Sequence, residues 1–172
     1  MLALAGVPGG SRDAVLPLPS VPRDVATQIV AFSTAVLQSS GNLLTGLANR
    51  IGQSPITTEL LQSTGAISAK ADPAHVRELV RDFFGMDVTW YGKLASAMQK
   101  HRPMDLDRIG CPVVYISAEQ DFVTDPQAVE EAADRTPSGK VERWDATHFL
   151  VLEYPDRVRD VLLDLAADVG LA

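Results

Sequence analysis

The spacing of two apolar runs constrains the fold of this chain more than any other feature. LALAGV follows Met1, and the next such run, PVVYISA, begins only at position 112. The first run does not alternate apolar with polar residues, which is typical of a strand covered on both faces in a parallel sheet, and the second is rich in β-branched residues. KVERWDA, at positions 140–146, predicts a third and shorter strand. The sequence therefore predicts an α/β fold with about three parallel strands.

The segments that follow the second and third predicted strands have helical patterns. Asp125 and Pro126 open PQAVEEAADRT, and Pro155 opens PDRVRDVLLDLAADVG. Proline is favoured at the first position of a helix, where its missing N–H costs no hydrogen bond. Strand, helix, strand and helix in this order indicate right-handed crossovers between neighbouring parallel strands.

About 80 residues with helical patterns separate the first two predicted strands, which is more than one crossover helix needs. RDVATQIVAFSTAVLQ and NLLTGLANRI have apolar residues at helical spacing. Asp72 can cap a helix in PAHVRELVRDFF, and Asp87 can cap one in VTWYGKLASAMQKH. We therefore expect a helical cap at 21–104, inserted between a first strand and loop at 1–20 and a C-terminal α/β segment at 105–172.

The composition is that of a globular protein and argues against a nucleic-acid partner and a membrane span. Of 172 residues, 46% are hydrophobic and 22% are charged, and the formal net charge is -7. No cluster of Lys and Arg is present to bind a phosphate backbone. No apolar run approaches the roughly 20 residues that span a bilayer, and MLALAGVPGG lacks the basic start of a secretory signal. We expect a cytoplasmic protein that has no membrane span and does not bind nucleic acid.

The residues that bind metals in proteins are few and scattered. Cys111 is the only cysteine, which excludes an intrachain disulfide, and its place at the start of a strand favours a small core residue. The histidines have no metal-ligand spacing: they are His75, His101 and His148. Asp105 and Asp107 are better explained by an acidic turn before a strand than by a cation site. We expect no metal and no cofactor.

Two polar residues come directly after predicted strands, where catalytic groups of open parallel sheets gather. Asp121 follows VVYISA and His148 follows VERWDA, so one strand-helix-strand unit brings them to neighbouring loops. A carboxylate there can hold the proton on one imidazole nitrogen and leave the other nitrogen free to accept a proton. Three nearby acids compete with Asp121 for this role: Glu119, Asp125 and Asp145. Asp125 is better explained as a helix cap.

These segments carry a specific resemblance. DRIGCPVVYISAEQDFVTDP, followed by WDATHFLVLEYPDRVRDVLLDLA, resembles the C-terminal part of the α/β-hydrolase superfamily. In that family an acid follows the seventh strand, a histidine follows the eighth, and helices inserted after the sixth form a lid. The resemblance implies that LALAGV is the sixth strand and that 21–104 is the lid. It also implies that Asp121 is the triad acid and His148 the general base.

The family's nucleophile has no counterpart in this chain. It lies in a G-x-S-x-G turn, and the only glycines at that spacing, Gly6 and Gly10, enclose Pro8. Ser11 is the serine nearest the end of the first strand, but it lacks the glycine-flanked turn that exposes a nucleophile. The resemblance therefore implies a C-terminal part that holds two members of a catalytic triad and is inactive alone.

Aromatic residues of the cap are candidates for substrate binding, because a lid excludes water from the reaction. The candidates are Phe83, Phe84, Trp90 and Tyr91, with Phe32 and Met98 as further apolar residues. Core packing remains the alternative for most of them. An apolar lid suggests a small apolar ester or acyl substrate, although fold does not settle the reaction.

The sequence is consistent with two functions. The first is an esterase-type hydrolase in which Asp121 orients His148 toward a serine outside this chain. The second is a non-catalytic module that keeps part of the hydrolase fold and binds an apolar ligand or a protein. In both, the opening strand has an unpaired edge, and exposed apolar edges promote association. We expect a homo-oligomer or association with a missing N-terminal half.

Overall fold

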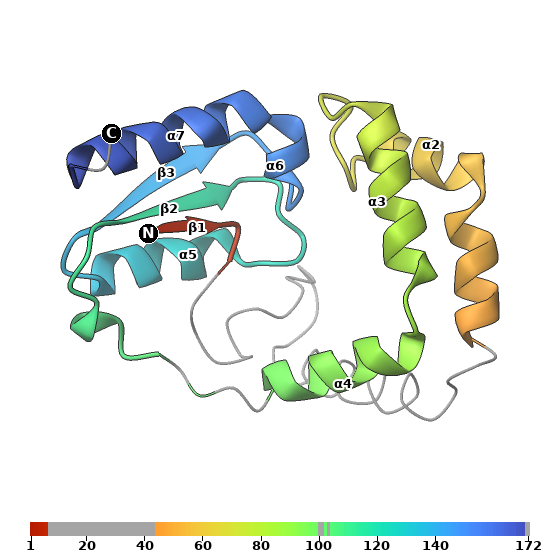
Figure 1. Ribbon diagram of the computed structural model, residues 1–172, viewed down its shortest axis with the longest axis horizontal. Coiled ribbons are helices and arrows are strands. Elements are labelled where there is room, and N and C mark those ends of the chain that lie inside the picture. Colours follow the sequence, from red (N-terminus) through yellow and green to blue (C-terminus); the bar gives the residue numbers. More distant parts are fainter. Residues whose placement is uncertain (7–43, 100–101, 103, 171–172) are drawn as a thin grey trace.

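The computed structural model describes residues 1–6, 44–99, 102 and 104–170. The helix expected in RDVATQIVAFSTAVLQ lies outside the described residues, as do Ser11, Phe32 and His101. In the described residues, an α/β core lies beside a set of helices from the middle of the chain (Figure 1). No helix within these residues is long and apolar enough to cross a membrane.

The core contains a three-stranded parallel sheet, as the sequence predicts. Its strands are β1 (Leu2–Leu4), β2 (Val113–Ala118) and β3 (Gly139–Trp144), in the order β1-β2-β3. Leu4 pairs with Ile116, and Ala118 pairs with Trp144. All three strands run in one direction, so β2 and β3 end at the same edge of the sheet.

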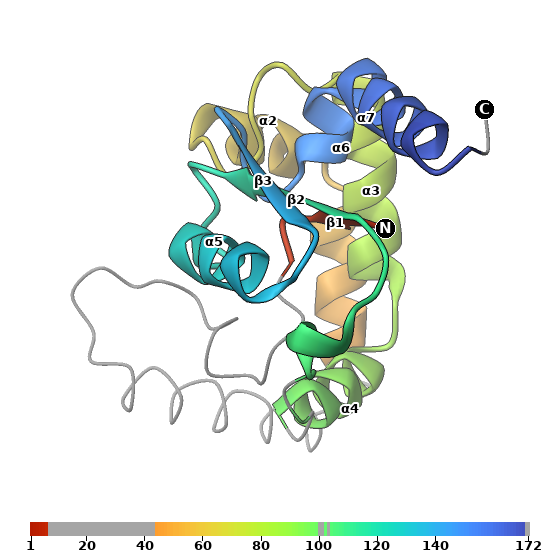
Figure 2. The ribbon, with the colours of Figure 1, turned by 90° about the vertical axis from the view of Figure 1, so that its left-hand side faces the viewer.

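Helices cover both faces of this sheet (Figure 2). On one face, α5 (Pro126–Arg135) packs against Val113 and Tyr115. On the other, α6 (Leu150–Glu153) and α7 (Pro155–Asp168) contribute to the cluster that contains Ile116 and Ala118. Alternate residues of β2 thus enter different clusters, so an uninterrupted apolar run is what this central strand requires.

Two expectations about the strands need correction. β1 is half-buried rather than fully covered, because it is the edge strand of the described sheet. Cys111 is exposed rather than part of the core, because β2 begins two residues later, at Val113. Of the acidic pair before β2, Asp105 precedes a short 3-10 helix, Leu106–Arg108, and Asp107 lies within it, as expected of a turn.

The helices between β1 and β2 form the region that we call the cap. They are a helix at 44–52, then α2 (Pro55–Ser63), α3 (Pro73–Gly85) and α4 (Val88–Gln99). Asp72 caps α3 by accepting from the Ala74 amide at 2.7 Å, and Asp87 accepts from the Thr89 amide at 2.8 Å. Both caps agree with the prediction from sequence.

The cap contacts the core through a hydrophobic cluster. Its buried members come from α3 and from the segment that precedes it: Ile67, Ala71, Val76 and Val80. Phe149 and Leu152, beside and within α6, pack against this cluster. The cap therefore meets the core next to the loop that carries His148.

Candidate functional site

Asp121 and His148 lie together at the carboxyl ends of β2 and β3. His148 Nδ1 and Asp121 Oδ2 are 3.0 Å apart. The Asp121 side chain is 1% exposed and the His148 side chain 31% exposed. The two loops meet because neighbouring parallel strands end at the same edge of the sheet. The pairing predicted from sequence is therefore present in the structure.

Backbone amides fix the direction of the Asp121 carboxylate. Its Oδ1 accepts hydrogen bonds from the amides of Val123 at 2.7 Å and Thr124 at 2.8 Å. The two carboxylate oxygens therefore have different partners, because Oδ1 binds the loop amides and Oδ2 faces His148. A carboxylate held in this way favours a proton on Nδ1 of a neutral imidazole.

The second imidazole nitrogen is available for chemistry. Among the described residues, His148 Nε2 has no hydrogen-bond partner, and the ring is partly open to solvent. With the proton on Nδ1, Nε2 carries a lone pair that can accept a proton from a hydroxyl group. The pair can thus supply the general base of an acyl-transfer reaction.

The loop that carries Asp121 also holds the end of β1. The Thr124 hydroxyl donates to the Ala5 carbonyl at 2.8 Å, and the Ala5 amide donates to the Ile116 carbonyl at 3.1 Å. Ala5 has a φ of 42°, in the left-handed region that costs a residue with a side chain roughly 1–2 kcal/mol. These contacts keep a strained turn close to the acid.

Two of the competing acids have other contacts and the third is exposed, which leaves Asp121 as the partner of His148. Asp125 caps α5 by accepting from the Gln127 amide at 3.0 Å. Asp145 accepts from Lys70 Nζ at 2.9 Å and from Gln120 Nε2 at 2.6 Å. Glu119 is exposed.

Lys70 connects the cap to the histidine loop, a contact that sequence reasoning missed. Its ammonium group donates to the Tyr154 hydroxyl and to Asp145. Its hydrogen bonds to Tyr154 and then to Asp145 raise the Lys70 pKa above its usual range. Lys70 and Asp145 are far apart in sequence and obey no shared pattern, so only the fold brings them together.

Three of the four predicted substrate-binding residues line an apolar pocket within the cap. Phe83, Phe84 and Tyr91 contribute to a pocket of about 450 Å³ that also includes Leu47 and Ile51. Tyr91 donates its hydroxyl to the Phe83 carbonyl at 2.7 Å, and burial raises its pKa. Neither Asp121 nor His148 lines this pocket.

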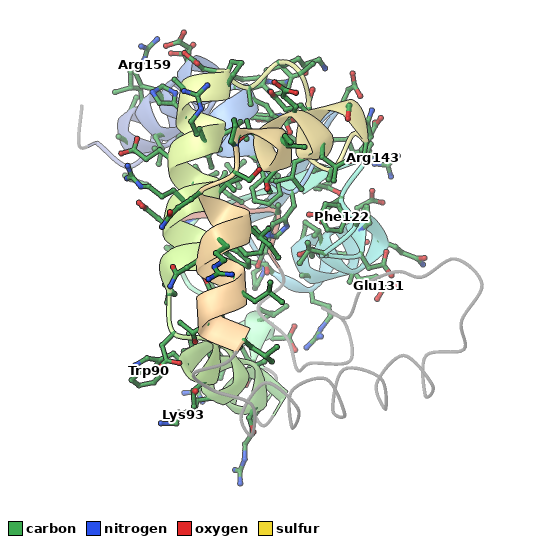
Figure 3. All side chains as sticks on the ribbon, turned by 90° about the vertical axis from the view of Figure 1, so that its right-hand side faces the viewer. Trp90, Lys93, Phe122, Glu131, Arg143 and Arg159 are labelled. Atoms are coloured by element: carbon green, nitrogen blue, oxygen red, sulfur yellow. The ribbon has the colours of Figure 1, made fainter. Side chains whose placement is uncertain are left out.

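Trp90, the fourth predicted residue, lies outside the pocket. It is largely exposed and stacks with the Lys93 ammonium, which is 5.2 Å from the ring centroid. Figure 3 shows both residues on α4, well separated from Phe122, which follows the catalytic-site candidate Asp121. The structure therefore does not place Trp90 with the other three.

The remaining candidates do not form a further site. His75 is exposed, in the first turn of α3. Within the described part of the chain, no group of three or more His, Cys, Asp and Glu side chains could hold a metal ion.

Comparison with solved structures identifies the fold. The chain matches BpoC from Mycobacterium tuberculosis H37Rv, which is assigned as a non-heme bromoperoxidase, with a TM-score of 0.63 and 19% sequence identity. This match covers 98% of the chain. The chain has part of the α/β-hydrolase fold. It also matches olei00960, a hydrolase from Oleispira antarctica, over 95% of its length with a TM-score of 0.57 and 16% identity.

The match covers only part of each relative. The chain spans 57% of BpoC and 54% of olei00960, about half of each. No protein-family profile and no curated protein sequence matches the chain. At these identities the match shows a shared fold and leaves the reaction open. The resemblance inferred from sequence is confirmed at the level of the partial α/β-hydrolase fold.

Proposed function

We propose that this chain supplies the acid, the histidine and the cap of an esterase-type α/β-hydrolase. Asp121 orients His148, and His148 acts as general base for a serine that lies outside these 172 residues. The observation that carries the proposal is the 3.0 Å contact between His148 Nδ1 and Asp121 Oδ2 at the ends of neighbouring parallel strands. The α/β-hydrolase fold supports it, because acid and histidine occupy this edge in that fold.

The proposed chemistry assigns one proton path to His148. Nε2 takes the serine proton as the serine oxygen attacks the ester carbonyl, and the resulting imidazolium gives that proton to the leaving alcohol. Water then attacks the acyl-serine by the same proton path, which releases the carboxylic acid product and restores the serine. Asp121 keeps Nδ1 protonated and stabilises the imidazolium without taking up the proton itself.

We infer the substrate class from the apolar lining of the cap pocket, which includes neither Asp121 nor His148. The pocket between the cap helices is lined by apolar and aromatic side chains, which suits the acyl part of a small apolar ester. Closure of such helices over the reacting groups would exclude water.

The test requires the polypeptide that carries the nucleophile. The coding sequence upstream of residue 1 and the neighbouring genes are searched for a G-x-S-x-G sequence, and that polypeptide is produced together with this chain. We expect hydrolysis of p-nitrophenyl butyrate and labelling of the serine by a fluorophosphonate. D121N should lower kcat roughly 10⁴-fold, and H148A at least as much.

Two results would contradict this proposal. One is the absence of any such nucleophile-bearing segment. The other is hydrolysis that H148A leaves unchanged. Turnover by the 172-residue chain alone, if lost in H148A, would show that a nucleophile lies within the chain, and Ser11 would then be replaced by alanine.

The cap pocket favours a second candidate function, a non-catalytic module that binds an apolar ligand. Its volume of about 450 Å³ is in the range of small-molecule sites, and its lining is almost entirely apolar. Leu47 lines the pocket and Leu60 does not, although both are largely exposed. Binding of 1-anilinonaphthalene-8-sulfonate should therefore weaken in L47Q and not in L60Q. Equal binding in both variants would contradict a ligand site in this pocket.

A further inference from the structure

Glu153 is a buried carboxylate that takes no part in the proposed hydrolysis. It is the last residue of α6 and is 6% exposed. Within the described part of the chain it has no salt-bridge partner. A buried carboxylate is costly unless several donors replace its water, so a charged group at this position calls for a specific set of contacts.

The contacts of Glu153 converge on the residue before His148. Oε2 accepts from the Thr147 amide at 3.0 Å, and Oε1 accepts from the Thr147 hydroxyl. Thr147 is completely buried, so these hydrogen bonds are shielded from water. Both the backbone and the side chain of Thr147 are therefore held by one carboxylate.

The same network reaches the residue after His148. The Thr147 hydroxyl oxygen accepts from the Phe149 amide at 3.2 Å. The Phe149 ring contacts the imidazole edge to face, with centroids 5.6 Å apart. Backbone groups on both sides of His148 are thus fixed by hydrogen bonds that lead to Glu153.

We propose that Glu153 is a positioning residue for His148. It fixes the backbone from which the imidazole projects, while Asp121 fixes the ring at Nδ1. The hydrogen bond at Nδ1 fixes one ring atom, so the direction of the ring also depends on the backbone of its loop. The inference rests on the proposed function, since the position of His148 matters for catalysis only if Nε2 is the general base.

Glu153 also receives a contact from the cap. Its Oε1 accepts from the Ser68 amide at 3.3 Å, and Ser68 lies next to Ile67, a buried member of the cap cluster. One carboxylate therefore contacts both the cap and the histidine loop. The position of the cap and the direction of the imidazole are coupled through this group.

The test follows the hydrogen-bonded Nδ1 proton of His148 by NMR in the purified chain, with H148A to assign the resonance. E153Q removes one acceptor oxygen, and T147V removes the hydroxyl with little change of volume. T147S keeps the hydroxyl. Y115F is the matched control, because it removes a buried hydrogen bond to Thr136, at 2.8 Å, on the α5 face of the sheet.

We expect the Nδ1 proton to exchange with water about tenfold faster in E153Q and T147V, or its resonance to broaden beyond detection, because each variant loses a buried hydrogen bond. T147S and Y115F should keep the resonance of the unmodified chain. If E153Q does not fold, the comparison of Nδ1 proton exchange between T147V and T147S tests the proposal.

Three outcomes separate this inference from the proposed function. Unchanged exchange in E153Q and T147V, with an unfolding midpoint lowered as in Y115F, would show that Glu153 only supports the fold and would overturn the inference. Absence of the resonance in the unmodified chain would also overturn it. Faster exchange in E153Q, combined with ester hydrolysis that does not depend on His148, would contradict the proposed function and support the positioning of the ring.

Discussion

At the residue scale, the division of contacts between the two Asp121 oxygens distinguishes this acid from its neighbours. Oδ1 accepts two backbone amides, and Oδ2 faces the imidazole. Asp145, which is more exposed, binds a lysine and a glutamine instead. Asp121 is therefore the acid that can orient His148, because its own loop donates to Oδ1 and leaves Oδ2 for the imidazole.

Thr124→Val tests whether the Asp121 loop depends on its contact with β1. The variant keeps the side-chain volume but removes the hydrogen bond to the Ala5 carbonyl, which leaves that carbonyl without its buried donor. We expect the free energy of unfolding to fall by about 1–3 kcal/mol, measured by urea denaturation. Thr64→Val, at an exposed position of the cap, serves as control. Equal stability of the two variants would contradict the role of Thr124.

The sequence was sufficient to predict the residues whose role depends on their position directly after a strand. Asp121 and His148 were predicted because each follows a strand, and parallel strands bring such positions together. Glu153 and Thr147 were not predicted as a pair, because a threonine and a glutamate in consecutive loop and helix segments form no recognisable pattern. Cys111 was misplaced because an apolar run does not show at which residue its strand begins.

At the element scale, the cap and the core are joined by a small number of side chains. Ile67, Val76 and Val80 form the buried part of their contact, and Phe149 reaches it from the histidine loop. The helices α3, α4 and α5 were predicted together with the aspartates at their N-termini, because an aspartate before the first turn is a local signal of a helix start. α2 lies within the predicted helical cap but was not predicted as a separate helix. The four-residue α6 was missed because it has too few repeats to define a period.

Ile67→Ala tests this junction. Ile67 is fully buried, and loss of its side chain should lower the free energy of unfolding by about 2–5 kcal/mol. Hydrogen exchange should increase in α3 more than in β2 and β3, because the cavity lies on the cap side. Ile56→Ala, at a largely exposed position of α2, should change little. Uniformly faster exchange in all elements would show that cap and core unfold as one unit, against this account.

At the scale of the whole molecule, the described core has helices on both faces of its sheet but an open edge at β1. Val114 donates to the Met1 carbonyl and Ala5 donates to Ile116, so the peptide groups of Leu2 and Leu4 face away from β2. The match spans about half of each relative. The sequence indicated the three strands but carries no signal for what pairs with the first.

We propose that the chain associates through the β1 edge. Analytical ultracentrifugation over a range of concentrations should show species larger than the monomer. Leu2→Lys should shift the chain toward the monomer, because a lysine on an edge strand opposes pairing. Leu163→Lys, at an exposed position of α7, is the matched control. A monomer at every concentration, or equal effects of both variants, would contradict this proposal.

The central claim is that Asp121 holds His148 with its proton on Nδ1 and its Nε2 free. The most direct measurement is the tautomer of His148, from long-range ¹H–¹⁵N correlation NMR at about pH 8.5, where a histidine is ordinarily neutral. The account predicts the Nδ1–H tautomer in the unmodified chain and its loss in D121N. An Nε2–H tautomer in the unmodified chain, or the same tautomer with and without D121N, would contradict it.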